Sequence, residues 1–336
     1  MKLYRNPCTD PCFNLALEEY LLTQEKQDDF ILLWRNRPSV ILGLNQNALE
    51  EIREEETASR GIPVVRRSTG GGAVYHDLGN LNFSFITDFS PDKAVSMQEF
   101  LAPVVAYLRS LGLPATADGR NDIIIAGHKV SGNAQRITGG RILHHGTLLF
   151  HSDLSVLARV LKPYDVKFQS KSTKSVRARV ANICQLLPTP LTLEEFQDGL
   201  SQYLTQNQWE HWKLSPTAKA YISQLSKEKY ESRLWNYGNL CPCTFQNRKH
   251  FSGGMLEIRL EIIENRMENI AIYGDFLATE EITPLLQRLK GVPYNKKQVY
   301  EAIRGLTIRR YLGEITLEEF LMVCFPNDLA KSDQND

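Results

Sequence analysis

Three consecutive glycines, Gly70, Gly71 and Gly72, separate an arginine pair from a run of alternating apolar and polar residues. Glycine has no Cβ, so such a segment can adopt positive φ and bring its backbone amides close to a ligand. Several inward-facing N–H groups bind an anion, and the guanidinium groups of Arg66 and Arg67 could bind the same anion. The same residues also fit a hairpin turn with two solvated arginines. The glycines therefore leave two interpretations, which the rest of the chain must decide.

The 336-residue chain has 39 basic and 39 acidic residues, so its formal net charge is zero. A general nucleic-acid binder usually has a basic excess, and we exclude that class of partner. The chain has no apolar run of about 18 residues, which argues against a transmembrane helix and a membrane partner. Its first residues lack the apolar segment of a signal peptide, and its six cysteines do not suggest a disulfide framework. We therefore expect a cytoplasmic protein.

Apolar patterning predicts helices and strands on both sides of the glycines. We expect a helix over residues 13–25, with Asn14 as its cap. The short apolar runs 30–35 and 39–44 are interpreted as the two strands of a hairpin. A strand over 62–65 is expected to lead into the glycines.

The last third of the chain has a different pattern. Residues 241–249 are interpreted as a linker, which divides the chain into domains 1–245 and 246–336. Its Cys-Pro-Cys spacing does not match a zinc site, and no metal ligand is firmly assigned. Two strands and three helices are expected after it, near residues 255–263, 269–276, 279–289, 296–304 and 315–324.

Residues 164–180 are rich in Lys, Arg and Ser and contain few apolar residues. Structureless segments of this length inside a domain are often functional lids, although a solvated surface loop fits as well. Lys129 lies between two strand-forming runs, where its ammonium could approach a carboxylate and a phosphate together. Standing alone, it would fit a surface strand lysine better, because lysines are mostly exposed. Together these cations and the glycines suggest a ligand with several negative charges, such as a nucleotide.

The sequence contains neither a P-loop nor a dinucleotide-binding fingerprint. The adjacent His144 and His145 would point to opposite faces of one strand, so they are poorly placed to bind the same metal ion. Cysteine is absent between Cys12 and Cys184, which argues against a cysteine nucleophile near the glycines.

Several segments resemble the signature segments of the bacterial lipoate-protein ligase A family. The resemblance covers nearly the whole chain, and its strongest motifs are RRSTGGGAVYHDLGN (66–80), RNDIIIAGHKVSGNAQR (120–136), HHGTLLFHSDL (144–154) and KSVRARVANI (174–183). It implies an α+β fold, with a large catalytic domain of the type shared with biotin protein ligases and a small α+β C-terminal accessory domain.

The resemblance also implies a two-step reaction. Lipoate would react with ATP to form lipoyl-AMP and pyrophosphate, and a lysine of a lipoyl domain would then displace AMP. The implied cofactors are ATP and Mg²⁺, with lipoate as substrate. The implied acceptors are lipoyl domains of 2-oxoacid dehydrogenase E2 subunits and the glycine cleavage H protein.

Site residues follow from the resemblance by position. Lys129 would be the catalytic residue and would contact both lipoate and the nucleotide. Residues expected to bind ATP or the adenylate are Arg67, Gly72, Ala73, Val74, Tyr75 and Lys129. Residues expected to bind lipoate are Lys129, Gly70, Gly71, His76 and His145. The adenylate-binding loop would contribute Lys171, Lys174, Ser175 and Arg177.

Other functions of the same fold stay open at this point. A lipoyltransferase would use ready-made lipoyl-AMP and would not activate lipoate. An octanoyltransferase passes its acyl group through a cysteine, which the gap between Cys12 and Cys184 disfavours. A protein that only binds lipoate would leave Lys129 and the glycines without a role.

Overall fold

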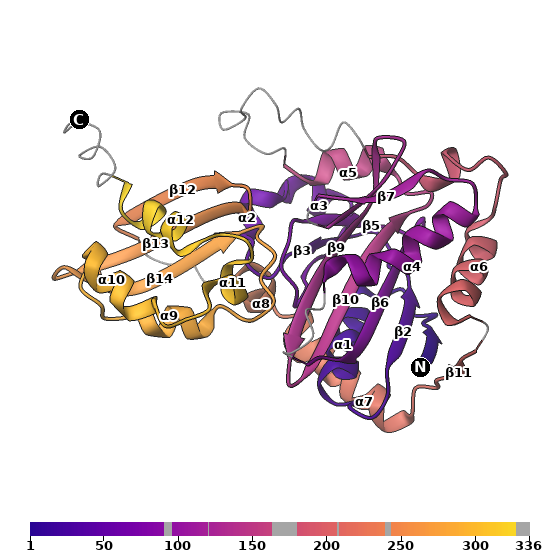
Figure 1. Ribbon diagram of the computed structural model, residues 1–336, viewed down its shortest axis with the longest axis horizontal. Coiled ribbons are helices and arrows are strands. Elements are labelled where there is room, and N and C mark those ends of the chain that lie inside the picture. Colours follow the sequence, from indigo (N-terminus) through magenta and orange to yellow (C-terminus); the bar gives the residue numbers. More distant parts are fainter. Residues whose placement is uncertain (91–95, 120, 163–179, 207, 239–242, 327–336) are drawn as a thin grey trace. The chain divides into compact units, whose positions relative to one another are not determined.

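The computed structural model describes residues 1–90, 96–119, 121–162, 180–206, 208–238 and 243–326 (Figure 1). Two compact units can be distinguished. The first comprises residues 1–42, 49–68 and 73–236, and the second comprises residues 43–48, 69–72 and 237–336. The second unit therefore combines two short N-terminal segments, one of which carries the three glycines, with the C-terminal part of the chain.

An eight-stranded mixed sheet forms the centre of the first unit. Its strands, in spatial order, are β11 (Glu210–His211), β1 (Lys2–Arg5), β2 (Phe30–Trp34), β6 (Asn80–Asp88), β10 (Arg141–Leu149), β9 (His128–Thr138), β8 (Asp122–Ile125) and β7 (Ala115–Asp118). A smaller sheet consists of β4 (Val64–Arg66), β3 (Ser39–Leu42) and β5 (Val74–His76).

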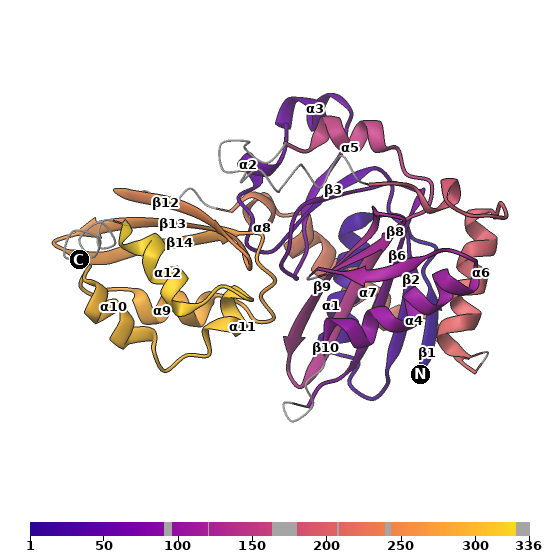
Figure 2. The same ribbon diagram turned by 45° about the horizontal axis from the view of Figure 1, so that its top comes forward.

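Helices cover both faces of the large sheet (Figures 1 and 2). One apolar cluster contains side chains of α4 (Met97–Ser110) and α6 (Leu193–Thr205), and another contains side chains of α1 (Pro11–Thr23) and α7 (Pro216–Leu225). Strand β2 has no polar face, because Ile31 and Leu33 enter the first cluster while Phe30 and Leu32 enter the second. Each such fully buried side chain contributes about 1.5–3 kcal/mol.

Shorter elements complete the first unit. They are α2 (Ala48–Glu51), which begins in the second unit, α3 (Glu54–Ser59), α5 (Leu154–Val160), η3 (Ile183–Gln185), η4 (Ser226–Tyr230) and α8 (Arg233–Tyr237), which ends in the second unit. Helices α3 and α5 lie side by side in both views (Figures 1 and 2).

The second unit contains an antiparallel sheet of β12 (Phe245–Phe251), β13 (Gly254–Ile263) and β14 (Arg266–Gly274). Helices α9 (Thr283–Leu289), α10 (Lys296–Ile303), α11 (Ile308–Leu312) and α12 (Leu317–Cys324) share one apolar cluster with this sheet. Three helices were expected here, and the five-residue α11 is the additional one. Strand β12 occupies most of residues 241–249, so the interpretation of that whole stretch as a linker is wrong.

Two local predictions in the first unit are also wrong. Helix α1 is capped by Asp10, whose side chain accepts hydrogen bonds from the amides of Cys12 and Phe13. Asn14, the expected cap, lies inside the helix and is fully buried. The runs 30–35 and 39–44 do not pair as a hairpin, because β2 and β3 belong to different sheets.

Backbone packing in the second unit makes Gly274 hard to replace. A Cβ added there would lie 2.1 Å from the Met255 carbonyl oxygen and 2.5 Å from the Phe276 ring. We expect Gly274→Ala to destabilise this unit by about 1–3 kcal/mol, the usual cost of overpacking. Gly305→Ala is the matched control, because a Cβ at Gly305 meets nothing within 4 Å. Hydrogen exchange of β13 amides in urea measures both, and equal protection in the two variants would contradict the prediction.

Candidate active site

Four of the buried ionisable groups of the first unit lie in or beside β4, β5, β10 and α1. Arg67 directly follows β4, His76 ends β5, His145 lies in β10 and Glu18 lies in α1. All four residues are less than 10% exposed. The carboxylate of Glu18 and the His145 ring interact electrostatically with Arg67 and His76, respectively. The fold thus brings together Arg67, His76 and His145, which lie up to 78 residues apart in the sequence.

Arg67 is held by the backbone of β3. Its amide donates to the Leu42 carbonyl at 2.9 Å and its guanidinium to the Ile41 carbonyl at 3.3 Å. Burial lowers the pKa of Arg67 to about 10, Glu18 opposes this shift, and the neighbouring Arg66 adds to it. The guanidinium therefore stays protonated at pH 7 and supplies a buried positive charge that an anionic ligand can neutralise.

His145 is paired with a carboxylate that the sequence analysis did not identify. Its Nδ1 lies 3.0 Å and 3.1 Å from the two carboxylate oxygens of Glu18. The hydroxyl of Ser84 donates to the same carboxylate at 2.6 Å, and the Trp34 indole donates to that hydroxyl at 2.9 Å. This network fixes the His145 ring and places its proton on Nδ1.

His144 faces the opposite side of β10, as expected from strand alternation. Its ring stacks on Phe100 with a centroid distance of 4.8 Å and also packs against Phe83 and Phe85. Phe83 and Phe85 belong to the apolar cluster under α4. His144 is therefore a core residue rather than part of the site.

Lys129, in β9, forms a second group with Asp122 in β8. Its ammonium lies 2.7 Å from the Asp122 carboxylate, and its side chain is 25% exposed. The carbonyl oxygen of Lys129 accepts from the amide of Ala181 at 3.1 Å, and Val180 forms a parallel bridge with Lys129. The chain therefore returns to Lys129 directly after residues 163–179. The expected loop residues Lys171, Lys174, Ser175 and Arg177 lie outside the described residues.

The glycines make contacts that the sequence did not predict. The amide of Gly71 donates to the Phe276 carbonyl at 3.2 Å, within the second unit. A Cβ at Gly70 would lie 2.6 Å from the same oxygen, so close backbone approach requires glycine there. The interpretation as a hairpin turn with two solvated arginines is wrong, because Arg66 and Arg67 are buried and the flanking strands β4 and β5 do not pair with each other. The Gly71 amide is used by the protein itself.

The residues that follow the glycines lead into β5. Ala73 precedes the strand, Val74 pairs with Ile41 and Tyr75 pairs with Val40. Tyr75 is buried, and burial raises the pKa of its phenol to about 12, with smaller contributions from Asp77 and Asp153. The Tyr75 phenol therefore stays protonated at pH 7.

Within the described residues, no group of three or more His, Cys, Asp or Glu side chains is arranged to hold a metal ion. None of the described helices is long and apolar enough to cross a membrane.

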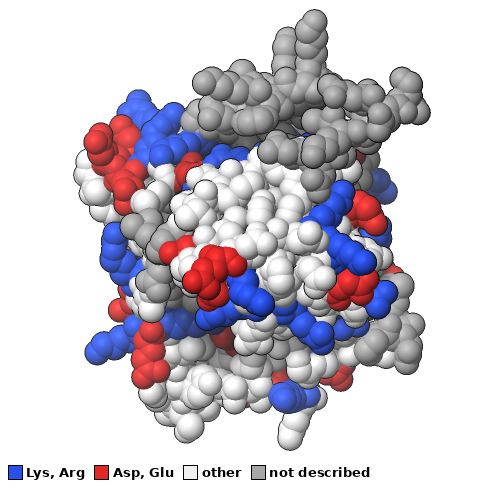
Figure 3. Space-filling model, turned by 90° about the vertical axis from the view of Figure 1, so that its left-hand side faces the viewer, with Lys and Arg blue, Asp and Glu red and all other residues white. Residues whose placement is uncertain are grey.

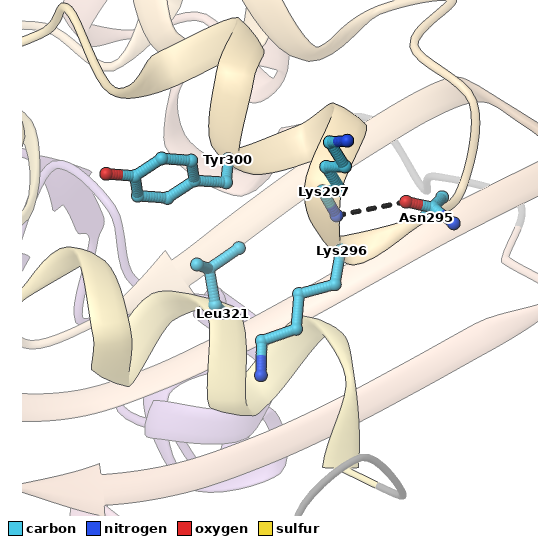
Figure 4. Close-up of a pocket in the computed structure, with 5 residues that line it drawn as sticks. All are labelled: Asn295, Lys296, Lys297, Tyr300 and Leu321. Atoms are coloured by element: carbon cyan, nitrogen blue, oxygen red, sulfur yellow. Dashed lines mark hydrogen bonds between the residues drawn. The ribbon is translucent and has the colours of Figure 1, made fainter.

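A shallow pocket in the second unit is lined by Asn295, Lys296, Lys297, Tyr300 and Leu321 (Figure 4). None of the expected site residues lines it. On the face in Figure 3, basic and acidic side chains are interspersed around an uncharged area, in keeping with the zero net charge.

Family models match two parts of the chain. The lipoyl protein ligase A/B catalytic domain matches residues 10–205, and the bacterial lipoate protein ligase C-terminus matches residues 241–323. A lipoate-protein ligase of Bacillus subtilis is 39% identical over 317 residues, which cover 93% of this chain and 96% of that protein. A lipoate-protein ligase of Staphylococcus aureus is 39% identical over 318 residues, covering 94% and 97%.

Solved structures show the same fold. LipL1 of P. falciparum in complex with lipoate is 23% identical, with a TM-score of 0.78 and coverage of 99% of this chain and 98% of that one. An archaeal bipartite lipoate protein ligase, described with its E2 lipoyl domain from Thermoplasma acidophilum, is 32% identical with a TM-score of 0.63, covering 73% and 98%. A lipoate-protein ligase A bound with ATP is 29% identical with a TM-score of 0.62, covering 71% and 99%. The expected α+β fold, with a C-terminal accessory part, is confirmed.

Proposed function

The chain belongs to the lipoate-protein ligase family, and from this premise we propose that it activates lipoate with ATP and transfers the lipoyl group to a lysine of a lipoyl domain. The observation that carries the proposal is the match to the catalytic-domain model over residues 10–205, which include all the candidate site residues. The proposed acceptors are lipoyl domains of 2-oxoacid dehydrogenase E2 subunits and the glycine cleavage H protein. The archaeal relative described with its E2 lipoyl domain supports the first of these.

In the first step a lipoate oxygen attacks the α-phosphorus of ATP, and the bond to pyrophosphate breaks. Both reactants are anions, so positive charge and N–H donors must reduce their repulsion. In this proposal Lys129 lies between the carboxylate and the α-phosphate, and exchanges its contact with Asp122 for contacts with the substrates. Arg67 and the backbone of residues 72–75 bind the nucleotide.

In the second step the amine of the acceptor lysine attacks the acyl carbon, the bond to AMP breaks, and the nitrogen loses a proton. The lipoyl-AMP anhydride is sensitive to water, so the site must exclude solvent between the steps. We propose that Gly70, Gly71, His76 and His145 contact the lipoyl part of the substrate. The burial of His76 and His145 supports this assignment, because a water-poor surface protects the anhydride.

Lys171, Lys174, Ser175 and Arg177 are proposed to bind the adenylate. Support comes from Val180 and Ala181, whose backbone contacts Lys129 at the end of this segment.

Mg²⁺ is proposed as the ion that accompanies ATP. Magnesium is commonly bound through phosphate oxygens with one or two carboxylates, and the described residues fit that mode better than an all-protein cage. We further propose a cytoplasmic location, and domains over residues 1–245 and 246–336. The separate family matches over residues 10–205 and 241–323 support two domains, and the second match begins at residue 241, shortly before the proposed boundary.

The test combines the protein with lipoate, Mg-ATP and a purified lipoyl domain. We expect AMP to form in proportion to a mass increase of one lipoyl group on the domain. A domain variant with its acceptor lysine replaced by arginine is the control, and it should stay unmodified. Modification only when lipoyl-AMP is supplied would instead identify a lipoyltransferase, and modification from neither donor would contradict the proposal.

A further inference from the structure

A line of three buried asparagines ends at His76 in the first unit. Hydrogen-bond distances along the line are 2.7 Å from Asn6 Nδ2 to Asn14 Oδ1, 2.8 Å from Asn14 Nδ2 to Asn36 Oδ1, and 3.0 Å from Asn36 Nδ2 to His76 Nδ1. Asn14 and Asn36 are fully buried, and Asn6 and His76 are nearly so. Their neighbours, rather than bulk water, therefore determine how each amide and the imidazole are oriented.

The orientation of each asparagine amide follows from neighbouring backbone groups that can only donate or only accept a hydrogen bond. The amide of Cys8 can only donate, and it contacts Asn6 Oδ1 at 3.1 Å, so the other end of Asn6 is its NH₂ group. That group donates to Asn14 Oδ1. The NH₂ group of Asn14 in turn lies 3.0 Å from the Cys8 carbonyl and 3.1 Å from the Arg35 carbonyl, both of which can only accept.

The same logic assigns the histidine. Asn14 donates to Asn36 Oδ1, so Asn36 presents its NH₂ group to His76 Nδ1. Nδ1 must therefore accept, and a neutral ring then carries its proton on Nε2. His76 Nε2 is buried, and it has no hydrogen-bond partner among the residues that the structure describes.

Groups around His76 favour its neutral form. The Trp34 ring packs against it with a centroid distance of 6.1 Å. Among the described residues, the charged or titratable groups that act on its pKa are Arg67 and His145. Burial lowers the pKa of His76 to about 3, and Arg67 and His145 contribute to the shift. His145 has the opposite orientation, because its Nδ1 contacts the carboxylate of Glu18.

We propose that Asn14 and Asn36 are positioning residues that hold His76 as a fixed Nε2–H donor for an oxygen atom of the acyl substrate. The identity of this ligand rests on the proposed function, whereas the tautomer rests only on the contacts above. The substrate oxygen is part of a carboxylate before activation and of an acyl group in the adenylate. A neutral donor can bind it in both states without changing its own charge.

Nitrogen-15 NMR of the histidine side chains tests the tautomer in the free protein. At pH 7 the expected spectrum assigns the proton of His76 to Nε2, and that of His145 to Nδ1 whenever His145 is neutral. His76→Gln identifies the His76 signals. A proton on Nδ1 of His76 would overturn the proposal even if the protein is an active ligase. The expected tautomer in a protein without ligase activity would contradict the proposed function instead.

Asn36→Asp tests the consequence for binding, because a carboxylate cannot donate to Nδ1. In this variant the pKa of His76 rises. Below that pKa the imidazolium still offers Nε2–H to the substrate oxygen. Above that pKa the ring is neutral and its proton lies on Nδ1. Nε2 then presents a lone pair to the substrate oxygen. We expect the KM for lipoate to increase about 10- to 100-fold as the pH rises through this pKa, the usual effect of losing a hydrogen bond to a charged group. The KM for ATP should change little.

Asn36→Ala is the matched control, because it removes the same amide without placing a hydrogen-bond acceptor next to Nδ1. It should show no such pH-dependent step, and combining Asn36→Asp with His76→Gln should abolish the step, since glutamine cannot titrate. Tryptophan fluorescence confirms that each variant is folded. A flat pH profile for folded Asn36→Asp, or an effect on the KM for ATP alone, would overturn the assignment of His76 to the acyl substrate.

Discussion

Lys129→Ala is expected to lower lipoate-dependent pyrophosphate release by about 10²–10³-fold, the typical loss when one contact to the transition-state charge is removed. The ammonium group is the one positive charge in the proposal that reaches both the carboxylate and the α-phosphate. Lys129 is partly exposed, and its single described ion pair is with Asp122. Its removal should therefore leave the fold intact while the two anions repel each other. Initial rates of pyrophosphate release, measured with saturating lipoate and Mg-ATP, check this result.

Lys219→Ala is a suitable control for that experiment. Lys219 is an exposed lysine of α7, so its replacement removes one positive charge without changing the site. Asp122→Asn removes the carboxylate that pairs with Lys129 but leaves the ammonium in place. It therefore distinguishes loss of the ion pair from loss of the positive charge. Pyrophosphate release by Lys129→Ala at the rate of Lys219→Ala would contradict the proposed role.

Much of the secondary structure could be predicted because it depends on local patterns. The strand expected near residues 255–263 is β13 (Gly254–Ile263), and the helix expected near residues 296–304 is α10 (Lys296–Ile303). Asn14 shows where such patterns mislead, since asparagine is a good helix cap but here serves a buried network. Asp10, followed by Pro11, was the better signal for the helix start. The hairpin prediction failed because β3 pairs with β4 and β5. The residues between the runs 30–35 and 39–44 do not indicate these long-range pairings.

Some residues of the candidate site could be predicted from the sequence and others could not, for a similar reason. Arg67, His76 and Lys129 lie in motifs that resemble a known family, so their roles could be proposed from position alone. Glu18 lies 127 residues from its partner His145, and nothing near Glu18 in the sequence signals that contact. Asn36 is 40 residues from His76, between the runs 30–35 and 39–44 that were interpreted as a hairpin. Such partners become visible only when the sheet brings distant strands together.

Acidification is expected to destabilise the first unit steeply, because two of its histidines are buried as neutral rings. Burial lowers the pKa of His144 to about 3, with a smaller contribution from His145, and the pKa of His76 is lowered to about 3 as well. In the unfolded chain both would titrate near the ordinary histidine value of about 6.5. Between these values the unfolded state binds protons that the folded state does not, so stability is complete above about pH 6.5 and is lost as the pH falls towards 3. Each histidine contributes a slope of about 1.4 kcal/mol per pH unit.

His144→Phe isolates one of these contributions. Phenylalanine can keep the stack on Phe100 and removes the titrating group, so the slope assigned to the two histidines should fall by about half. All four tryptophans lie in the first unit, so fluorescence-detected urea unfolding between pH 4.5 and 7.5 reports on this unit alone. His128→Gln, at an exposed histidine, should leave the slope unchanged. An unaltered slope in His144→Phe would mean that His144 is protonated in the folded state, which is incompatible with its burial among the aromatic rings under α4.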